Sequence, residues 1–169
     1  DATYLIEAEP DKAIELLENL ADFYRVLMGY CAKPQISLAE EKSFLEAYIA
    51  INADEYARYT IGLDFTLAEG TSIPSMVLQP LIENAIQHGL RTRFEGGEIG
   101  VRAYAHEGRA VLEVCDNGQG IGDASADSLF QFGHALYNIR DRVKLLYGED
   151  SDIVASNRGD GGTRVKVVL

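Results

Sequence analysis

The chain has 169 residues, 47% of them hydrophobic and 25% charged, and its 15 basic and 27 acidic side chains give a formal net charge of −12. This length predicts one domain, or one domain with a helical appendage, and the composition excludes a collagen-like, disordered or disulfide-stapled chain. The negative charge argues against a general nucleic-acid binder or a basic membrane-surface protein, because phosphate backbones and anionic lipids repel it.

The charge is unevenly distributed. Residues 1–70 hold 5 basic and 14 acidic side chains, whereas residues 71–169 hold 10 basic and 13 acidic ones, so we expect any bound anion in the second part. Cys31 and Cys115 share no CxxC spacing and are typical of buried thiols in a reducing compartment. No apolar run reaches the ~18 residues of a membrane span. We therefore expect this chain to be cytoplasmic and not membrane-inserted, and its start at Asp1 is expected of a piece of a longer protein.

The first 60 residues predict two antiparallel helices. Pro10 suits a first helical turn, and apolar residues then recur at three- and four-residue steps, at Ile14, Leu17, Leu20, Ala21, Tyr24 and Leu27. This stripe fits a bundle or dimer seam as well as an ordinary core face. After the break at Lys33-Pro34, Ser37 to Glu40 form a capping-box pattern that opens a second helix running to about Arg58.

After residue 60 the hydrophobic period changes. The pattern predicts, in chain order, a strand over 61–67, a helix over 75–90, a hairpin over 99–115 turned at Glu107-Gly108, a Gly-rich irregular stretch over 116–133, a helix over 135–147 and two strands over 152–157 and 163–169. The predicted fold class is α+β, with a mostly antiparallel sheet and helices on one face. Residues 1–60 form the helical part and residues 61–169 the second domain.

Three clusters carry candidate chemistry. In the first, Asp116 to Gly120 (DNGQG) stand where a buried strand ends. There the acid can accept a hydrogen bond from an amino group such as that of adenine, and Gly118 and Gly120 let the backbone approach a flat ring or a phosphate. An ordinary Asn-Gly turn explains the same residues.

The second cluster lies on the helix predicted over 75–90. Asn84, Gln87 and His88 share one helical face and can point together into a cleft, where the Asn84 carbonyl oxygen is an acceptable Mg²⁺ ligand. A solvated face with His88 near the helix end is the alternative.

The third cluster runs from Gly133 to Arg142. Its small residues precede a helix and can present N–H groups to phosphate oxygens, with Arg140 or Arg142 adding charge. A flexible loop and an N-terminal helix turn with surface arginines are the alternative. The order of the three clusters and their contexts suit a single nucleotide cleft.

These segments resemble the ATP-binding region of LytS-like sensor histidine kinases. The run from Leu78 to Gly89 (LQPLIENAIQHG) resembles their N box, usually written LQPLVENAIKHG. The other matching segments are Asp116 to Gly120 for the first glycine box, Gly133 to Arg142 for the second (GIGLxNVxxR), Gly161-Gly162-Thr163 for the closing GGT motif, and Ser37 to Glu41 with Tyr48 to Ile51 for the stretch "L-x-E-E … Y-L-x-I". The likeness covers most of the chain from about residue 10.

The resemblance implies a Bergerat-type fold, a two-layer α/β sandwich preceded by a helical hairpin and shared with gyrase, Hsp90 and MutL. In it ATP with Mg²⁺ binds under a mobile lid, here residues 119–135. The resemblance implies that Asp116 recognises adenine, that Gly118 and Gly120 shape its pocket, and that Thr163 lies near it. It implies that Asn84 binds Mg²⁺ and that the backbone from Gly133 through Ala135 to Leu136 contacts the phosphates. Asn138 and Arg142 match positions of the second glycine box. Glu83 is a family position that acts as a base or as a structural partner.

Three departures from the family pattern stand out. Gln87 replaces the usual Lys of the N box, and Arg91, Arg93 or Arg140 are candidates to replace its charge. Ala135 replaces a Gly, which adds a methyl group near the phosphate contacts. The family's phosphate-accepting histidine lies in a PHFLFN-like motif upstream of residue 10, and no such motif occurs in this sequence. We therefore expect this chain to bind ATP without phosphorylating itself.

The resemblance implies the ATP-binding catalytic region of a two-component sensor histidine kinase, with the rear part of its dimerisation helices in residues 1–60. In the full protein the γ-phosphoryl group would pass to a histidine and then to the receiver domain of a response regulator. We expect a homodimer through the helical region, no nucleic-acid partner, and an upstream membrane sensor. The alternatives are an anti-sigma-type serine kinase, a gyrase- or MutL-like ATPase in which Glu83 activates water, and a degenerate scaffold that binds nucleotide weakly or not at all.

Overall fold

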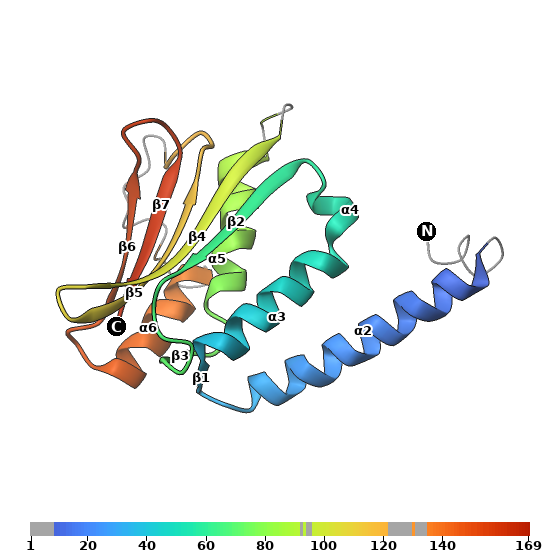
Figure 1. Cartoon of the computed structure of the whole chain (residues 1–169). Coiled ribbons are helices and arrows are strands. Elements are labelled where there is room, and N and C mark those ends of the chain that lie inside the picture. The colour runs from blue at the N-terminus through green and yellow to red at the C-terminus, as the bar shows by residue number, and fades with distance from the viewer. Residues whose placement is uncertain (1–8, 92, 94–95, 122–129, 131–134) are drawn as a thin grey trace.

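The computed structural model describes residues 9–91, 93, 96–121, 130 and 135–169, with only the backbone described at some positions of the first helix. A five-stranded sheet has the order β2-β4-β5-β7-β6 (Figure 1). Its strands are β2 (Tyr59–Phe65), β4 (Gly97–His106), β5 (Arg109–Asp116), β6 (Asp152–Asn157) and β7 (Thr163–Val168). Strand β2 is parallel to β4, and the other neighbours are antiparallel. The predicted α+β class is confirmed.

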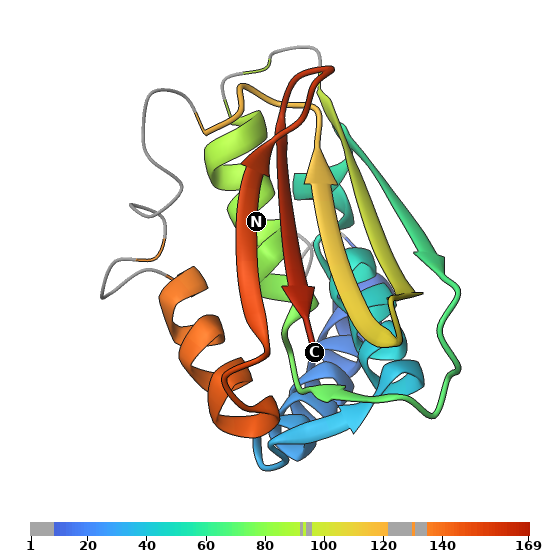
Figure 2. The ribbon, with the colours of Figure 1, turned by 90° about the vertical axis from the view of Figure 1, so that its left-hand side faces the viewer.

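The helices lie on one side of this sheet (Figure 1). They are α2 (Pro10–Cys31), α3 (Leu38–Ile51), α4 (Ala53–Tyr56), α5 (Leu78–Asn84) with its π-helical continuation η1 (Ala85–Leu90), and α6 (Ala135–Tyr147). Of these, α3, α5 and α6 pack against the sheet, and α2 packs on α3. Figure 2 shows the strands in front of the helices, so the other face of the sheet is open among the described residues. Two short strands, β1 (Gln35–Ser37) and β3 (Ser72–Pro74), pair antiparallel beside the start of α3.

The core lies between the sheet and α3, α5 and α6. Inward side chains of β4 and β5 such as Val101 and Leu112 are fully buried, and they join Leu78, Leu81 and Leu45 in one cluster. Helix α3 therefore packs into the same core as the sheet. The predicted boundary between residues 60 and 61 stays a prediction.

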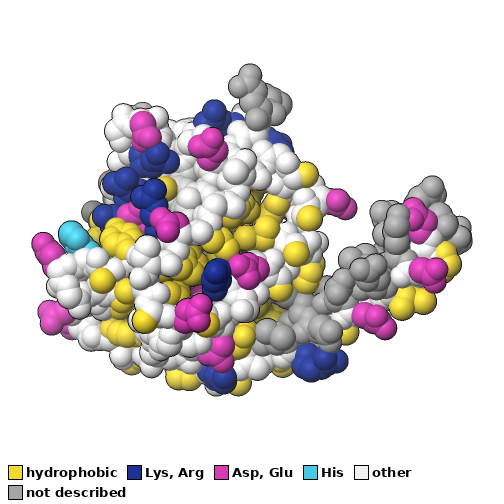
Figure 3. All heavy atoms as spheres, in the orientation of Figure 1, with side chains coloured by type: hydrophobic (Ala, Val, Ile, Leu, Met, Phe, Trp, Pro, Cys, Tyr) yellow, Lys and Arg dark blue, Asp and Glu magenta, His cyan; other side chains and the backbone are white. Residues whose placement is uncertain are grey.

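The helix α2 contrasts with α3. It begins at Pro10, as predicted, but Ile14, Leu17 and Tyr24 of its apolar stripe are each more than half exposed. Acidic and hydrophobic side chains lie side by side along this helix (Figure 3). Among the described side chains, the stripe is therefore not a core face, and its role as a dimer seam stays a prediction.

The capping box at α3 is formed as predicted, since Ser37 Oγ accepts from the Glu40 N–H at 3.2 Å and Glu40 Oε2 accepts from the Ser37 N–H at 2.8 Å. The predicted end near Arg58 was too late. The helix α3 stops at Ile51, where the Asn52 side chain donates to the Tyr48 carbonyl oxygen at 2.8 Å, and only the single turn α4 follows.

The predicted start of the next helix at residue 75 was too early. Met76 has a positive φ of 52°, and α5 begins at Leu78. The reason is remote in sequence: the fully buried Glu41 carboxylate accepts the N–H groups of Met76, Val77 and Leu78 at 2.8–2.9 Å. Burial raises the pKa of this carboxyl, although the three N–H donors act in the opposite direction.

The later elements agree closely with the sequence analysis. Strands β4 and β5 form the predicted hairpin, with Glu107 and Gly108 at positive φ in its turn. The helix α6 and strands β6 and β7 occupy the predicted ranges to within a residue. No helix among the described residues is both long and apolar enough to cross a membrane.

Candidate functional site

A cavity of about 220 Å³ opens between the α5–η1 helix and the adjoining ends of β5 and β7. Its apolar lining consists of Leu81, Ala85, Val114, Val165 and Ile121, and its polar lining of Asn84, Gln87, His88, Asp116, Gln119 and Thr163, with Gly89 and Gly120. The structure therefore brings the predicted N box, first glycine box and GGT motif together at one place. An apolar floor with a few polar groups at its margin is the usual form of a small-molecule site.

Asp116 is the acidic group of this cavity. It ends β5, is only 3% exposed, and its Oδ1 accepts the N–H groups of Gly118 at 2.8 Å and Thr163 at 3.2 Å. Among the described residues, no donor reaches its other oxygen, Oδ2. The Asp116 carboxylate is thus fixed by the backbone and keeps one acceptor for a ligand that enters the cavity.

The turn after Asp116 is fastened to the end of η1. The Gln119 N–H donates to the Gly89 carbonyl oxygen at 3.1 Å, and the Gln119 side chain donates to the His88 carbonyl oxygen at 3.0 Å. The close approach of this turn to the end of η1 requires a glycine at position 89, because a Cβ there would lie 2.6 Å from Asp116 Oδ1. The two boxes therefore form one rigid wall of the cavity.

The predicted cluster on the N-box helix faces the cavity, although the helix is not α-helical throughout. It changes to a π-helix over Ala85–Leu90, which the sequence analysis had missed. Such π segments are frequent at functional sites. Asn84, Gln87 and His88 all line the cavity, and Asn84 is partly buried while the other two side chains are exposed.

Glu83 lies on the other side of the same helix. Its Oε1 accepts from the Tyr48 hydroxyl at 2.5 Å and from the Gln79 amide at 2.8 Å. It lines a separate cavity of about 160 Å³ with Tyr48 and Tyr56. In this conformation Glu83 is a structural partner of α3 and does not face the cavity that holds Asp116.

The second glycine box is only partly described. Gly133 and most of the predicted lid, residues 122–129 and 131–134, lie outside the described residues. Ala135 and Asn138 are exposed at the start of α6, whereas Leu136 is buried in the core. Arg142 donates to the Met76 carbonyl oxygen at 3.3 Å. Leu136, Asn138 and Arg142 therefore do not line the cavity.

Positive charge is scarce around the described part of the cavity, where His88 is the only basic residue of the lining. Arg93 donates to the Asn117 carbonyl oxygen, and Arg140 forms an ion pair with Asp152 at 2.9 Å. Neither arginine lines the cavity, so in this conformation neither supplies the charge that a lysine at position 87 would bring.

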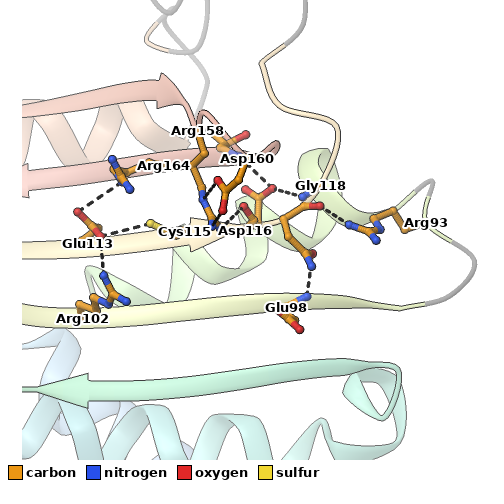
Figure 4. Close-up of polar contacts among 12 residues, drawn as sticks. Arg93, Glu98, Arg102, Glu113, Cys115, Asp116, Gly118, Arg158, Asp160 and Arg164 are labelled. Carbon is orange, nitrogen blue, oxygen red and sulfur yellow. Dashed lines mark hydrogen bonds and ion pairs between the residues drawn. The ribbon is translucent and has the colours of Figure 1, made fainter.

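Two supporting residues were missed by sequence reasoning. Asn157 Oδ1, at the end of β6, accepts the Ile121 N–H at 2.7 Å and so holds the chain beyond Gly120. Arg158 donates to the Asp116 carbonyl oxygen at 3.0 Å, as Figure 4 shows beside the end of β5. Asn157 ends β6 and Arg158 follows it, in an Asn-Arg-Gly-Asp run, and only the tertiary structure distinguishes them from ordinary turn residues.

A two-layer α/β sandwich with its cavity between one helix and the strand ends belongs to the class of domains that bind a small molecule at the edge of a sheet. Comparison with known proteins then identifies the family. The chain belongs to the histidine kinase-, DNA gyrase B- and HSP90-like ATPases, whose family pattern matches residues 72–169. A second pattern, described as histidine kinase, matches residues 2–59. The resemblance seen in the sequence is confirmed.

Three similar proteins illustrate the relationship. The sensor protein LytS of Streptococcus agalactiae is 31% identical over 166 residues, covering 93% of this chain and 29% of that protein. The Acinetobacter baumannii histidine kinase AdeS has a TM-score of 0.61 at 20% identity, covering 94% of this chain and 80% of that one. The histidine kinase ThkA in complex with the response regulator TrrA has a TM-score of 0.54 at 15% identity, covering 94% and 49%. The structural matches show the shared fold, and the chain spans less than a third of the LytS protein.

Proposed function

We propose that this chain is the ATP-binding catalytic region of a two-component sensor histidine kinase. The full protein transfers the γ-phosphoryl group of ATP to a histidine outside this sequence and then to the receiver domain of a response regulator. The observation that carries the proposal is the Asp116 carboxylate, buried at the cavity, fixed through Oδ1 and open at Oδ2.

The cavity fits the adenine end of ATP. The apolar side chains of Val114, Val165 and Leu81 provide a surface for the purine ring, and Asp116 Oδ2 can accept from its exocyclic amino group. Thr163, whose N–H holds Asp116 Oδ1, lies on the same side. The contact with Asp116 distinguishes adenine from purines that carry a carbonyl at that position.

The part of the site that binds the phosphates of ATP is assigned from the order of the motifs in the sequence. Asn84 stands at the cavity wall and can offer its amide oxygen to Mg²⁺. Mg²⁺ supplies charge neutralisation for the phosphates when it is bound. The backbone from Gly133 to Leu136 is proposed for the phosphate contacts, and Gln87 and His88, which line the cavity, are proposed to hydrogen-bond the nucleotide. We assign no phosphate contact to the Asn138 and Arg142 side chains, which lie away from the described cavity.

The partners follow from the relatives. ThkA is seen in complex with a response regulator, which supports a receiver domain as the phosphate acceptor of the full protein. The exposed apolar stripe of α2 supports a homodimer through the helical region. We propose that this chain is the cytoplasmic portion of a membrane sensor kinase, and its similarity to the sensor protein LytS supports the sensor role.

The hydrolytic alternative needs Glu83 as a base. A general base must be within hydrogen-bonding reach of the water it activates. Here Tyr48 and Gln79 occupy Glu83 Oε1, and Glu83 is absent from the lining of the Asp116 cavity. This arrangement favours the kinase over a gyrase-like ATPase.

The proposal is tested by calorimetric titration of this chain with a non-hydrolysable ATP analogue and Mg²⁺, beside the variants Asp116→Ala and Asn84→Ala. We expect binding by the parent chain, loss of binding in Asp116→Ala, and in Asn84→Ala a loss confined to titrations that contain Mg²⁺. A parent chain that binds no analogue would overturn the proposal and support the degenerate scaffold.

A further inference from the structure

Helix α3 holds the N-box helix at its beginning. The buried Glu41 carboxylate accepts three consecutive backbone N–H groups, those of Met76, Val77 and Leu78, at 2.8–2.9 Å. The first N–H groups of a helix have no partner within the helix. Glu41 therefore supplies from another element the cap that α5 lacks in its own sequence, where Val77 makes no side-chain capping bond.

The same helix also holds the other end of α5. The Tyr48 hydroxyl donates to Glu83 Oε1 at 2.5 Å, and its oxygen lies 3.0 Å from the hydroxyl oxygen of Tyr56. Burial, followed by the hydrogen bond to Glu83, raises the pKa of Tyr48, so its hydroxyl keeps its proton as a donor. Glu83 directly precedes Asn84, which lines the Asp116 cavity.

The two contacts come from one face of α3. Glu41 and Tyr48 are seven residues apart, which is two helical turns, and Leu45 between them is fully buried. The contacts bracket the whole of α5, from the residues that precede Leu78 to the Glu83 side chain beside Asn84. Gln87, one turn later, lines both the Tyr48 cavity and the Asp116 cavity. A movement of the Tyr48 side chain can therefore reach the nucleotide side of the helix through a single residue, Gln87.

We propose that Glu41 and Tyr48 are positioning residues, which set the place of Asn84 and Gln87 at the nucleotide cavity by holding α5, the first part of the N-box helix, at both ends. The proposal rests on the proposed function for its effect on ATP, whereas the contacts themselves can be tested without nucleotide. The proposal gives one shared role to Glu41, in the L-x-E-E segment, and Tyr48, in the Y-L-x-I segment. Because α2 packs against α3, the proposal also makes α3 the link between α2 and the site.

The test compares Tyr48→Phe with the matched variant Tyr104→Phe. Tyr104 also donates to a glutamate, Glu113, at 3.0 Å, but on the open face of the sheet. Each change removes one hydroxyl and one Tyr–Glu hydrogen bond, and Tyr48→Phe also removes the contact with the Tyr56 hydroxyl. Amide hydrogen exchange over residues 78–90 is measured without nucleotide, and affinity for the ATP analogue is measured by calorimetry with Mg²⁺ and with EDTA.

We expect Tyr48→Phe to speed exchange at the end of α5 and to weaken Mg²⁺-dependent analogue binding by about tenfold, the size of a hydrogen bond to a charged group. Binding in EDTA should change less, because adenine recognition by Asp116 is untouched. Tyr104→Phe should leave exchange over 78–90 and both affinities at the parent values. A merely structural role would instead lower both affinities together with the melting temperature.

The proposal is overturned if Tyr48→Phe matches the parent chain in exchange and in Mg²⁺-dependent affinity. Glu41→Gln adds a second variant, and faster exchange confined to residues 76–80 is expected there, because one carboxylate oxygen becomes a donor. If the parent chain bound no analogue, the proposed function would fail, and the exchange data would still decide whether α3 holds α5.

Discussion

Strand β5 carries two buried carboxylates on opposite faces of the sheet, and their surroundings differ. Glu113 and Asp116 are each only 3% exposed. Glu113, on the open face, is surrounded by side chains, with the Tyr104 hydroxyl at 3.0 Å and charged groups of Lys166, Arg164 and Arg102 at 3.5–3.9 Å. Asp116, on the helix-covered face, is held by backbone N–H groups (Figure 4).

Under the proposed function, this difference separates a structural carboxylate, Glu113, from a ligand-binding one, Asp116. Burial raises the pKa of Glu113, but the hydrogen bonds from Cys115 and Tyr104 and the charges of Arg164 and Lys166 outweigh it, so the net pKa is lowered. Its charge is satisfied within the fold. Asp116 is equally buried, yet one of its oxygens meets no donor among the described residues, and the residue lines a cavity. Burial of an acid alone therefore does not mark a site, whereas a fixed and incompletely bonded acid does.

The largest expected effect contrasts the same chemical change at the two carboxylates. Asp116→Asn should weaken binding of the ATP analogue by about 100-fold, because it replaces an acceptor with an amide beside the adenine amino group. Glu113→Gln, the matched control on the same strand, should leave the affinity within about twofold of the parent value, which is below the effect of one hydrogen bond. Calorimetry measures both affinities, and an equal loss of affinity in the two variants would contradict the distinction between the two carboxylates.

A smaller effect is expected from the glycine that faces Asp116. In Gly89→Ala the new Cβ would lie 2.6 Å from Asp116 Oδ1, so the carboxylate must shift. We expect the affinity for the ATP analogue to fall by about tenfold, as for a displaced hydrogen bond to a charged group. Gly100→Ala, on the open face with no atom within 4 Å of its Cβ, is the control. Unchanged affinity in Gly89→Ala would show that Asp116 is not held as described.

The free energy of unfolding should be lowered more by Glu113→Gln than by Asp116→Asn, which is the reverse of their order in nucleotide affinity. Glu113→Gln leaves Arg164, Lys166 and Arg102 without their shared counter-charge. Because these cations are partly exposed, the cost is expected to be about 1–2 kcal/mol in the free energy of unfolding. Urea denaturation at neutral pH measures it. A variant as stable as the parent chain would mean that the cluster is a solvated surface network without net effect.

The smallest effect is in the pH dependence of unfolding. The pKa of Glu113 is lower in the folded chain than its ordinary value, so its stabilisation is present above the unfolded pKa and is lost as the pH falls through the folded one. Between neutral and acid pH the parent chain should therefore lose more stability than Glu113→Gln. Parallel curves for the two proteins over this range would contradict the lowered pKa.

The sequence was informative where local chemistry decides the structure. The capping box at Ser37, the positive-φ turn at Glu107-Gly108 and the hydrophobic alternation of the last strands each depend on neighbours in sequence, and these elements are present. The start of α5 was missed because its cap comes from Glu41, 37 residues before Leu78. The pairing of β1 with β3 was missed for the same reason, since three-residue strands carry too little pattern to show a distant partner.

The candidate site was predictable in part. The motifs placed Asp116, Asn84 and Thr163 in one cavity, where the structure has them. The orientation of Glu83 was not predictable, because adjacent helical residues point in different directions and only Tyr48 shows which way Glu83 turns. Second-box residues such as Arg142 match the family pattern, yet in this conformation its side chain contacts the Met76 carbonyl oxygen. A motif identifies a segment, and tertiary contacts decide which side chains reach the cavity.

The most direct test of the account asks whether Asp116 reads the purine. ITP carries a carbonyl oxygen where ATP carries the exocyclic amino group, so it presents an acceptor to the Asp116 acceptor. Calorimetry with both nucleotides and Mg²⁺ should show that the parent chain prefers ATP by about 100-fold, and that Asp116→Asn, which can donate to the carbonyl, loses or reverses this preference. Equal affinity of the parent chain for ATP and ITP would contradict the account.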